Sequence, residues 1–167
     1  MAKRIITISR EFGSGGRFIG EEVAKKLGIA YYDKEMIGQI AEQAGLSSEY
    51  VRENAELSPK KGWFAYAFSG RDITGKSVED MVYEAQRKVI MEIAEKENCV
   101  IIGRNADFIL KDRKDVLNVF IHGSIPEKVR RICSLYNVTE VDAIKMINDI
   151  DKRRRTNYNF YTEQKWG

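Results

Sequence analysis

Four short runs along the chain are apolar at almost every position and lack the polar alternation of a half-exposed strand. They lie at residues 4–9, 29–32, 99–102 and 116–121. Runs of this kind predict strands that are buried on both faces, as in a parallel sheet. After the first run, Ile19, Val23, Ala24 and Leu27 recur at helical spacing, and Gly28 is expected to end that helix.

The same periodicity predicts further helices between and after the strands, at 33–44, 47–55, 77–96, 124–135 and 139–155. Asp33 is placed to cap the first of them, and Ser124 with Glu127 matches a capping box. The apolar face of the last helix is expected to consist of Val141, Ile144, Ile147 and Ile150.

Strands that alternate with helices in this way predict an α/β fold, in which a parallel sheet of four strands, or five, carries helices on both faces. The chain has 167 residues, of which 43% are hydrophobic, and this suits one domain that spans 1–167. Ligands of such sheets bind beyond the carboxyl ends of the strands. Three polar or glycine-rich segments are expected at that edge, namely 10–17, Asp33 and 103–107.

A glycine-rich turn stands directly between the first strand and the first helix. Gly13, Gly15 and Gly16 let the backbone curl without steric cost, so that its N–H groups and the helix N-terminus point at a bound anion. A plain strand-to-helix turn is the alternative interpretation. Three glycines within four residues favour a phosphate site, which we expect to use the turn and its neighbours Arg10, Gly13, Ser14, Gly15, Gly16 and Arg17.

Composition narrows the choice of partner. The charged fraction is 32% and the formal net charge is only +3, which argues weakly against nucleic acid as the main partner. Cys99 and Cys133 each lie in an apolar segment and are expected to be buried free thiols of a reducing compartment. No apolar run has the length of a membrane span or of a signal peptide core, so we expect a cytoplasmic protein that does not engage a membrane.

Four segments together resemble the cytidylate kinase-like family, a branch of the P-loop nucleoside monophosphate kinases. The resemblance covers nearly the whole chain and is carried by residues 6–17 (ITISREFGSGGR), 32–35 (YDKE), 101–107 (IIGRNAD) and 151–154 (DKRR). It implies a three-layer P-loop kinase-like fold. It also implies phosphoryl transfer from ATP to a nucleoside monophosphate, with CMP or dCMP as the default acceptor and Mg²⁺ as the expected ion.

The resemblance further implies roles for individual residues. Arg104 is expected on the acceptor phosphate, and Asp33 lines up with an acidic site residue after the second strand. The stretch 46–80 is expected as an acceptor-side insert, whose aromatic residues between Trp63 and Phe68 form a base pocket or a subunit interface. Residues 149–162 are expected as a basic lid. The expected catalytic residues are Arg17, Asp33, Arg104 and Arg153, and the further phosphate-binding residues outside the glycine turn are Arg130, Arg131, Lys152, Arg154 and Arg155.

The glycine turn departs from the standard motif at two positions. Gly16 stands where a P-loop has its lysine, and Phe18 stands where it has the Ser or Thr that holds magnesium. Arg17 is the expected substitute for the lysine, and the sequence identifies no metal ligand. These departures leave open a nucleotide-binding regulatory module that has lost catalysis.

Two further alternatives concern partners. The basic run 152–155 is followed by Tyr158, Phe160, Tyr161 and Trp166, which could stack on bases in a nucleic-acid-binding protein; we rank this last. Relatives usually carry one more strand after the lid, so the run 116–121 is expected to form an apolar sheet edge here. A homodimer would cover that edge, and truncation of the sequence would also explain it.

Overall fold

The computed structural model describes residues 5–33, 35–54 and 77–167. Its four strands pair in parallel in the order β2–β3–β1–β4. They are β1 (Ile5–Arg10), β2 (Ala30–Tyr32), β3 (Cys99–Ile102) and β4 (Val116–Ile121). The predicted α/β class is therefore confirmed, and β4 lies at one edge of the sheet, as expected.

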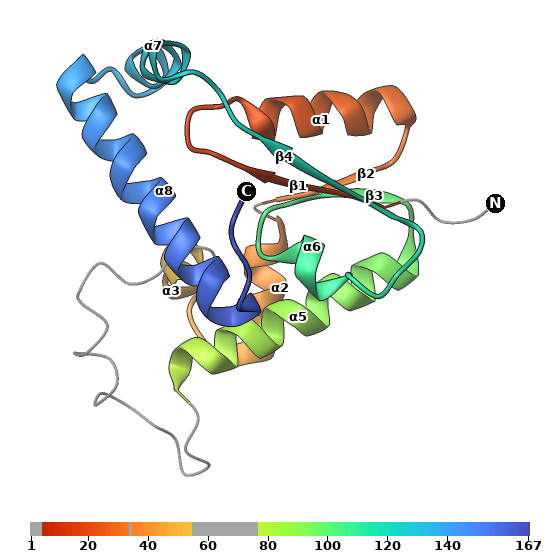
Figure 1. Cartoon of the computed structure of the whole chain (residues 1–167). Helices are drawn as coiled ribbons and strands as arrows, with labels where there is room; N and C mark the ends of the chain where they lie inside the picture. The colour runs from red at the N-terminus through yellow and green to blue at the C-terminus, as the bar shows by residue number, and fades with distance from the viewer. Residues whose placement is uncertain (1–4, 34, 55–76) are drawn as a thin grey trace.

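The described helices follow the predicted order along the chain (Figure 1). They are α1 (Gly16–Leu27), α2 (Glu35–Ala44), α3 (Ser48–Asn54), α5 (Val78–Lys96), α6 (Ala106–Ile109), α7 (Ile125–Tyr136) and α8 (Glu140–Thr162). The one-turn helix α6 is the only one of them that periodicity did not predict, because four residues are too few to show a helical repeat.

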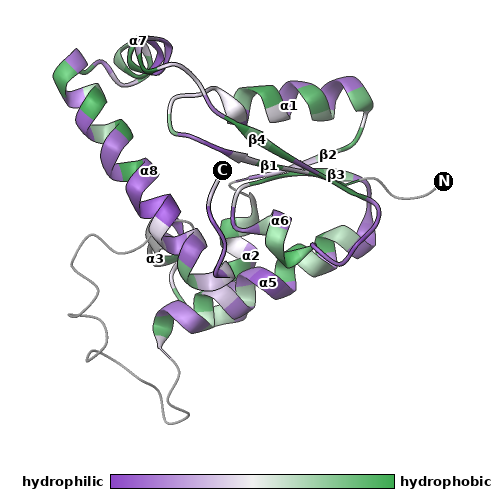
Figure 2. Ribbon diagram, in the orientation of Figure 1, coloured by the Kyte–Doolittle hydropathy of each residue, from purple (hydrophilic) through white to green (hydrophobic). Residues whose placement is uncertain are grey.

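The sheet is covered on both faces, as its continuous apolar strands require. Cys99 and Ile101 of β3 pack into a core with α2, α3 and α5, whereas Val100 and Ile102 pack into a second core beneath α1. All four side chains are buried. Figure 1 shows α1 on one side of the sheet and α2 and α5 on the other, and Figure 2 shows the strands β3 and β4 in hydrophobic colours.

Local sequence signals fix the helix ends. Gly28 ends α1 in the left-handed conformation, with φ of 64°. The hydroxyls of Ser77, Ser124 and Thr139 cap α5, α7 and α8, each accepting a hydrogen bond from the backbone N–H three residues later. At α7 the structure thus contains the serine half of the predicted capping box.

Two expectations about the last helix were wrong. The helix does not end with the basic run but continues to Thr162. Its inward face contains Ile147, but Val141 and Ile144 are 62% and 44% exposed. The buried stripe runs instead through Ala143, Ile147, Asp151 and Tyr158, because the helix meets polar groups of the glycine turn halfway along its length.

Part of the expected acceptor-side insert 46–80 lies outside the described residues. This applies to 55–76, and with it to the aromatic residues from Trp63 to Phe68. Within the described ranges, no helix has both the length and the apolar character that crossing a membrane requires.

Candidate anion-binding site

The glycine turn is curled as its sequence predicts. Gly13 and Gly15 have φ of 81° and 86°, in the region that side chains disfavour, and Gly15 is the residue that precedes α1. Among the described residues no side chain caps this helix, and its first turn contains no acidic residue. The partial positive charge at the start of α1 is therefore available to an anion.

Gly16 is required by a close approach rather than by its backbone conformation. A Cβ atom built on Gly16 would stand 2.6 Å from Cβ and 2.9 Å from Cγ of Arg10. Arg10 ends β1 and is only 5% exposed. The stem of Arg10 thus occupies the space in which a lysine at position 16 would begin.

A pocket at the carboxyl edge of the sheet gathers three of the predicted arginines. Arg10 comes from β1, Arg104 from the turn after β3, and Arg154 from α8. The pocket is lined by Ser9, Arg10, Gly103, Arg104, Asn105, Arg154, Tyr158 and Trp166. Guanidinium groups that converge from three elements suit an oxyanion, because their N–H donors can make paired, charge-assisted hydrogen bonds.

The turn that carries Arg104 has an unusual backbone. Gly103, Arg104 and Asn105 all have positive φ, of 63°, 59° and 55°. Two non-glycine residues in this region are strained, and such strain persists only when the surroundings hold it. Here the fully buried Gln86 of α5 donates from Nε2 to the Arg104 carbonyl at 2.8 Å, and Asn105 donates to Asn157 Oδ1 of α8 at 3.3 Å.

Arg17 and Asp33, predicted separately, are in contact. Arg17 Nε donates to Asp33 Oδ2 at 2.6 Å, and its Nη2 forms an ion pair with the same oxygen. The Arg17 side chain is 45% exposed whereas that of Asp33 is 9% exposed, so the pair links the surface at the start of α1 to a buried carboxylate. Neither residue lines the pocket of Arg10, Arg104 and Arg154.

Of the other predicted cations of α7 and α8, some hold the glycine turn and the rest lie elsewhere on the two helices. Arg131 donates from Nη1 to the Gly13 carbonyl, and Arg154 donates to the Arg10 carbonyl at 3.2 Å, so both hold the glycine turn. Arg130 instead pairs with Glu127 at 3.0 Å on the exposed side of α7. The remaining members of the basic run lie along α8: Lys152 and Arg155 are exposed, and Arg153 stands 4.0 Å from Asp149.

An ionic cluster beneath the glycine turn, in which Lys128 and Asp151 are buried and Glu11 is partly exposed, was not predicted. Lys128 of α7 contacts Glu11 Oε2 at 3.0 Å and Asp151 Oδ2 at 3.1 Å. Burial raises the pKa of Glu11, but hydrogen bonds from Lys128 and from the Gly123 amide outweigh this and lower the pKa below its ordinary value. A lysine four residues before the buried Ile132, on the inward face of α7, was the available sequence signal.

Gln86 was missed for a related reason. It sits at helical spacing between the buried Val82 and Ile90 of α5, inside an apolar stripe. A polar residue at a core position usually has a specific hydrogen-bond partner. The sequence therefore marked Gln86 as unusual, although it could not show that the partner is the Arg104 carbonyl.

The aromatic residues near the C-terminus are mostly engaged within the fold. Tyr158 is buried and donates to Asp107 Oδ2 at 2.7 Å. Tyr161 stacks on Tyr83 of α5 with ring centroids 4.0 Å apart, and Trp166 packs edge-on against Phe120 of β4. Of the four aromatics proposed for base stacking, Phe160 alone is classed as exposed, which weakens the nucleic-acid hypothesis.

Comparison with known families identifies one match. The family model described as "Cytidylate kinase-like family" matches residues 5–167. The match includes every predicted site residue and confirms the resemblance of the four motif segments. It supports a nucleotide kinase-like role. A comparison with curated proteins gives no significant match.

Solved structures resemble the chain over almost its full length. An uncharacterized protein from Eubacterium ventriosum has 29% sequence identity and a TM-score of 0.73, over 99% of this chain and 81% of that one. A shikimate kinase from Bacteroides thetaiotaomicron has 18% identity and a TM-score of 0.53, over 96% and 83%. Shikimate kinase from Acinetobacter baumannii, solved with shikimate, has 14% identity and a TM-score of 0.50, over 99% and 86%. The shikimate kinases share the fold.

Proposed function

The chain belongs to the cytidylate kinase-like family, and from this premise we propose that it transfers the terminal phosphoryl group of ATP to a nucleoside monophosphate, with CMP or dCMP as the expected acceptor. The bond between the γ-phosphorus of ATP and the oxygen that bridges it to the β-phosphate breaks, and that oxygen leaves with ADP. A new bond forms to a phosphate oxygen of the acceptor, so the products are ADP and a nucleoside diphosphate. The observation that carries the proposal is the convergence of Arg10, Arg104 and Arg154 on one pocket beside the glycine turn.

Phosphoryl transfer asks the protein mainly for alignment and positive charge. On the donor side, the curled backbone from Gly13 to Gly16 and the start of α1 would hold the phosphates of ATP. On the acceptor side, Arg104 would bind the phosphate of the acceptor, for which the pocket must widen, because its present volume of about 10 Å³ holds roughly one water molecule. Arg131 and the basic run of α8, which includes Arg153, would add charge around the transferred group.

The residues present fit the phosphates better than they fit a magnesium ion. Phe18 is 69% exposed and has no hydroxyl to offer, and the Asp33 carboxylate is held by Arg17. Among the described residues, no three carboxylate, histidine or cysteine side chains gather as metal ligands. Magnesium usually binds nucleotide phosphates together with one or two carboxylates, so Asp33 is the residue we would test as its ligand.

A coupled assay with ATP and a panel of nucleoside monophosphates tests the proposal. We expect turnover with a pyrimidine monophosphate, and we expect Arg104→Ala to raise its KM by about tenfold or more, because a charge-assisted contact to phosphate is lost. Lys114→Ala, which removes an exposed cation from the segment between α6 and β4, is the control and should leave KM unchanged. Absence of turnover with every monophosphate would exclude the kinase proposal.

A second candidate is a nucleotide-binding module that does not turn over. It is favoured by the absence of a lysine at position 16 and of a hydroxyl at position 18. Calorimetry with ATP and CMP separates the two candidates. Binding without turnover supports the module, and absence of binding excludes both.

The edge position of β4 supports a further proposal, that two copies of the chain associate. Leu117 is 59% exposed on this strand, and an apolar sheet edge tends to pair with another chain. Light scattering tests it: a dimer that Leu117→Lys converts to a monomer supports pairing through β4, whereas a monomeric wild type excludes it.

A further inference from the structure

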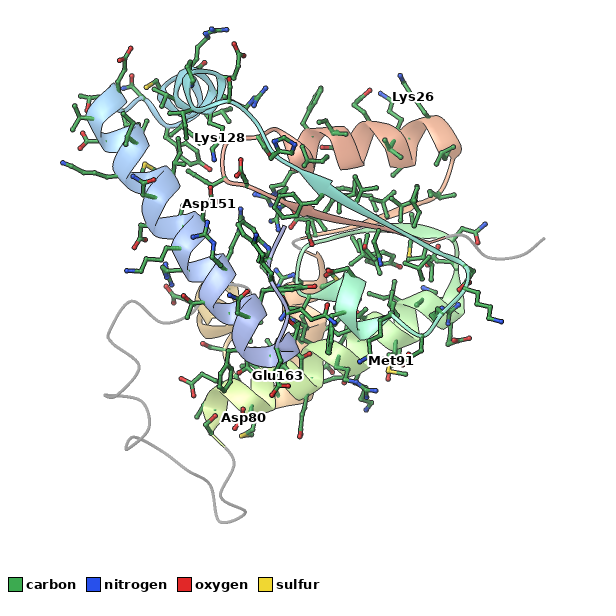
Figure 3. The ribbon with its side chains drawn as sticks, viewed as in Figure 1. Lys26, Asp80, Met91, Lys128, Asp151 and Glu163 are labelled. Atoms are coloured by element: carbon green, nitrogen blue, oxygen red, sulfur yellow. The ribbon has the colours of Figure 1, made fainter. Side chains whose placement is uncertain are left out.

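The buried lysine of α7 joins two carboxylates that belong to different parts of the site. Glu11 lies directly after β1, in the glycine turn, and Asp151 lies in α8. The ammonium of Lys128, whose side chain is only 3% exposed, stands 3.0 Å from one and 3.1 Å from the other. Figure 3 shows Lys128 and Asp151 facing one another between α7 and α8.

Backbone N–H groups complete the cluster. Phe12 donates to the second oxygen of Asp151 at 2.6 Å, and Gly123, just after β4, donates to Glu11 Oε2 at 3.2 Å. Two carboxylates and one lysine carry an excess negative charge, and these two N–H groups offset it. Each ionic group therefore has a partner, which is the condition for keeping charges in a buried place.

Such a cluster is weak evidence for stability. Removing charges from water costs several kcal/mol for each ion, and well-packed apolar residues in their place are often about as stable. The charged groups instead fix the relative positions of the segments that carry them, since each carboxylate accepts hydrogen bonds in fixed directions. Asp151 in particular links α8 to the amide of Phe12, within the turn that precedes α1.

The position of Asp151 connects the cluster with the expected phosphate contacts. The basic run 152–155 follows it directly, and Arg154 of that run donates to the Arg10 carbonyl at 3.2 Å. The turn and α8 are thus joined at two points, Phe12 with Asp151 and Arg10 with Arg154. Because both links lie within one turn of α8, they fix how the basic run stands relative to the glycine turn.

We propose that Glu11, Lys128 and Asp151 form a positioning network, which holds the phosphate-binding turn and the basic segment of α8 in register for a bound triphosphate. The proposal rests on the proposed function for the identity of the ligand. None of the three residues is expected to touch the phosphates. They act through the backbone that they hold, and the effect should therefore be local to the turn and to α8.

Amide hydrogen exchange followed by NMR tests the network without a ligand. In Lys128→Met we expect the amides from Phe12 to Ser14 to exchange about tenfold faster, while the β3 amides keep their protection. Lys145→Met, an exposed lysine of α8 paired with Asp142, is the matched control and should change neither region. Unchanged exchange at Phe12, or an equal loss of protection in β3, would overturn the proposal.

Two substitutions of Asp151 separate its hydrogen bond from its bulk. Asp151→Asn keeps an oxygen that can accept from Phe12, whereas Asp151→Leu has similar size and no acceptor. We expect the asparagine variant to retain most of the Phe12 protection and the leucine variant to lose it. Equal behaviour of the two variants would contradict a positioning role for Asp151. Since both keep the branched outline and the number of side-chain heavy atoms of aspartate, both are expected to fold.

The ligand arm uses calorimetry with ATP, at a temperature where all variants are folded. We expect Asp151→Leu to weaken ATP binding about tenfold and Asp151→Asn to weaken it much less. Equal ATP affinities in the two variants would remove the link between the network and the phosphates. If the wild type binds no ATP, the proposed function is wrong. The hydrogen-exchange experiment then still tests whether the network holds the glycine turn, because it needs no ligand.

Discussion

Arg10 lies so close to Gly16 that a Cβ atom on the glycine would stand 2.6 Å from the Cβ of the arginine. Because that atom is fixed to the backbone of β1, it cannot rotate out of the way. The glycine at the position of the standard lysine is therefore a requirement of packing. The same contact puts the aliphatic stem of Arg10 in the space where a lysine side chain at position 16 would begin. Arg10 also lines the pocket that contains Arg104 and Arg154.

The contact predicts that replacing Gly16 by alanine destabilises the protein, although alanine normally stabilises a helix relative to glycine. Gly16→Ala should destabilise the protein by about 1–3 kcal/mol, because the new methyl group overpacks a buried site. Gly38→Ala in α2, where no atom of the described residues lies within 4 Å of the new methyl group, should instead stabilise by about 0.5–1 kcal/mol through helix propensity. Urea denaturation measures both. A stabilising Gly16→Ala would show that Arg10 can move aside.

The expected role of Arg17 predicts a loss of affinity for ATP. Its ion pair joins a half-exposed guanidinium to the buried carboxylate of Asp33, so its loss should also cost about 1–3 kcal/mol in the free energy of unfolding. We expect Arg17→Ala to weaken ATP binding about tenfold, as measured by calorimetry. Lys26→Ala, at the far end of α1 (Figure 3), is the control. Unchanged affinity in Arg17→Ala would leave Arg10 as the substitute for the standard lysine.

Gln86 is predicted to support Arg104 from a distance. Gln86→Met fills a similar volume but leaves the buried Arg104 carbonyl without its donor, which should cost about 1–3 kcal/mol in the free energy of unfolding. Because the positive φ of Arg104 would lose a restraint, the KM for the monophosphate should rise more than the KM for ATP. Steady-state kinetics in the folded range distinguish this from a general loss of stability, which would lower the active fraction and leave both KM values unchanged.

The ionic cluster predicts how stability depends on pH. Since the pKa of Glu11 is lower in the folded state, the unfolded chain binds a proton more readily. The contribution of Glu11 is therefore complete above the unfolded pKa of about 4.3 and is lost as the pH falls through the folded value. We expect Glu11→Gln to be less stable at pH 7 and to lose less stability between pH 5 and pH 3 than the wild type.

Urea denaturation across that pH range provides the measurement. Glu21→Gln, at an exposed position of α1, serves as the control and should follow the wild type. If the free energy of unfolding falls by the same amount between pH 5 and pH 3 in the wild type and in Glu11→Gln, Glu11 does not contribute to the pH dependence.

Local patterns predicted most of the fold. The runs at 99–102 and 116–121 became strands with the predicted bounds, and Gly28, Ser77 and Thr139 mark helix ends as their residue types indicate. Periodicity was less informative for α8. There Val141 and Ile144 continue an apolar spacing that the structure leaves exposed, because burial depends on which neighbours a helix meets as well as on its own repeat.

By itself, the sequence determined the parallel α/β arrangement, the curled glycine turn and the family. Each of these is specified by residues near one another in the chain, through backbone conformation and side-chain spacing. Only the tertiary structure decided which charges meet. Lys128 joins partners 117 and 23 positions away, and Arg10 comes to fill the space beside Gly16. The physical reason is that an ion pair or a steric contact depends on distance in space, and the chain path sets that distance only after the helices have packed on the sheet.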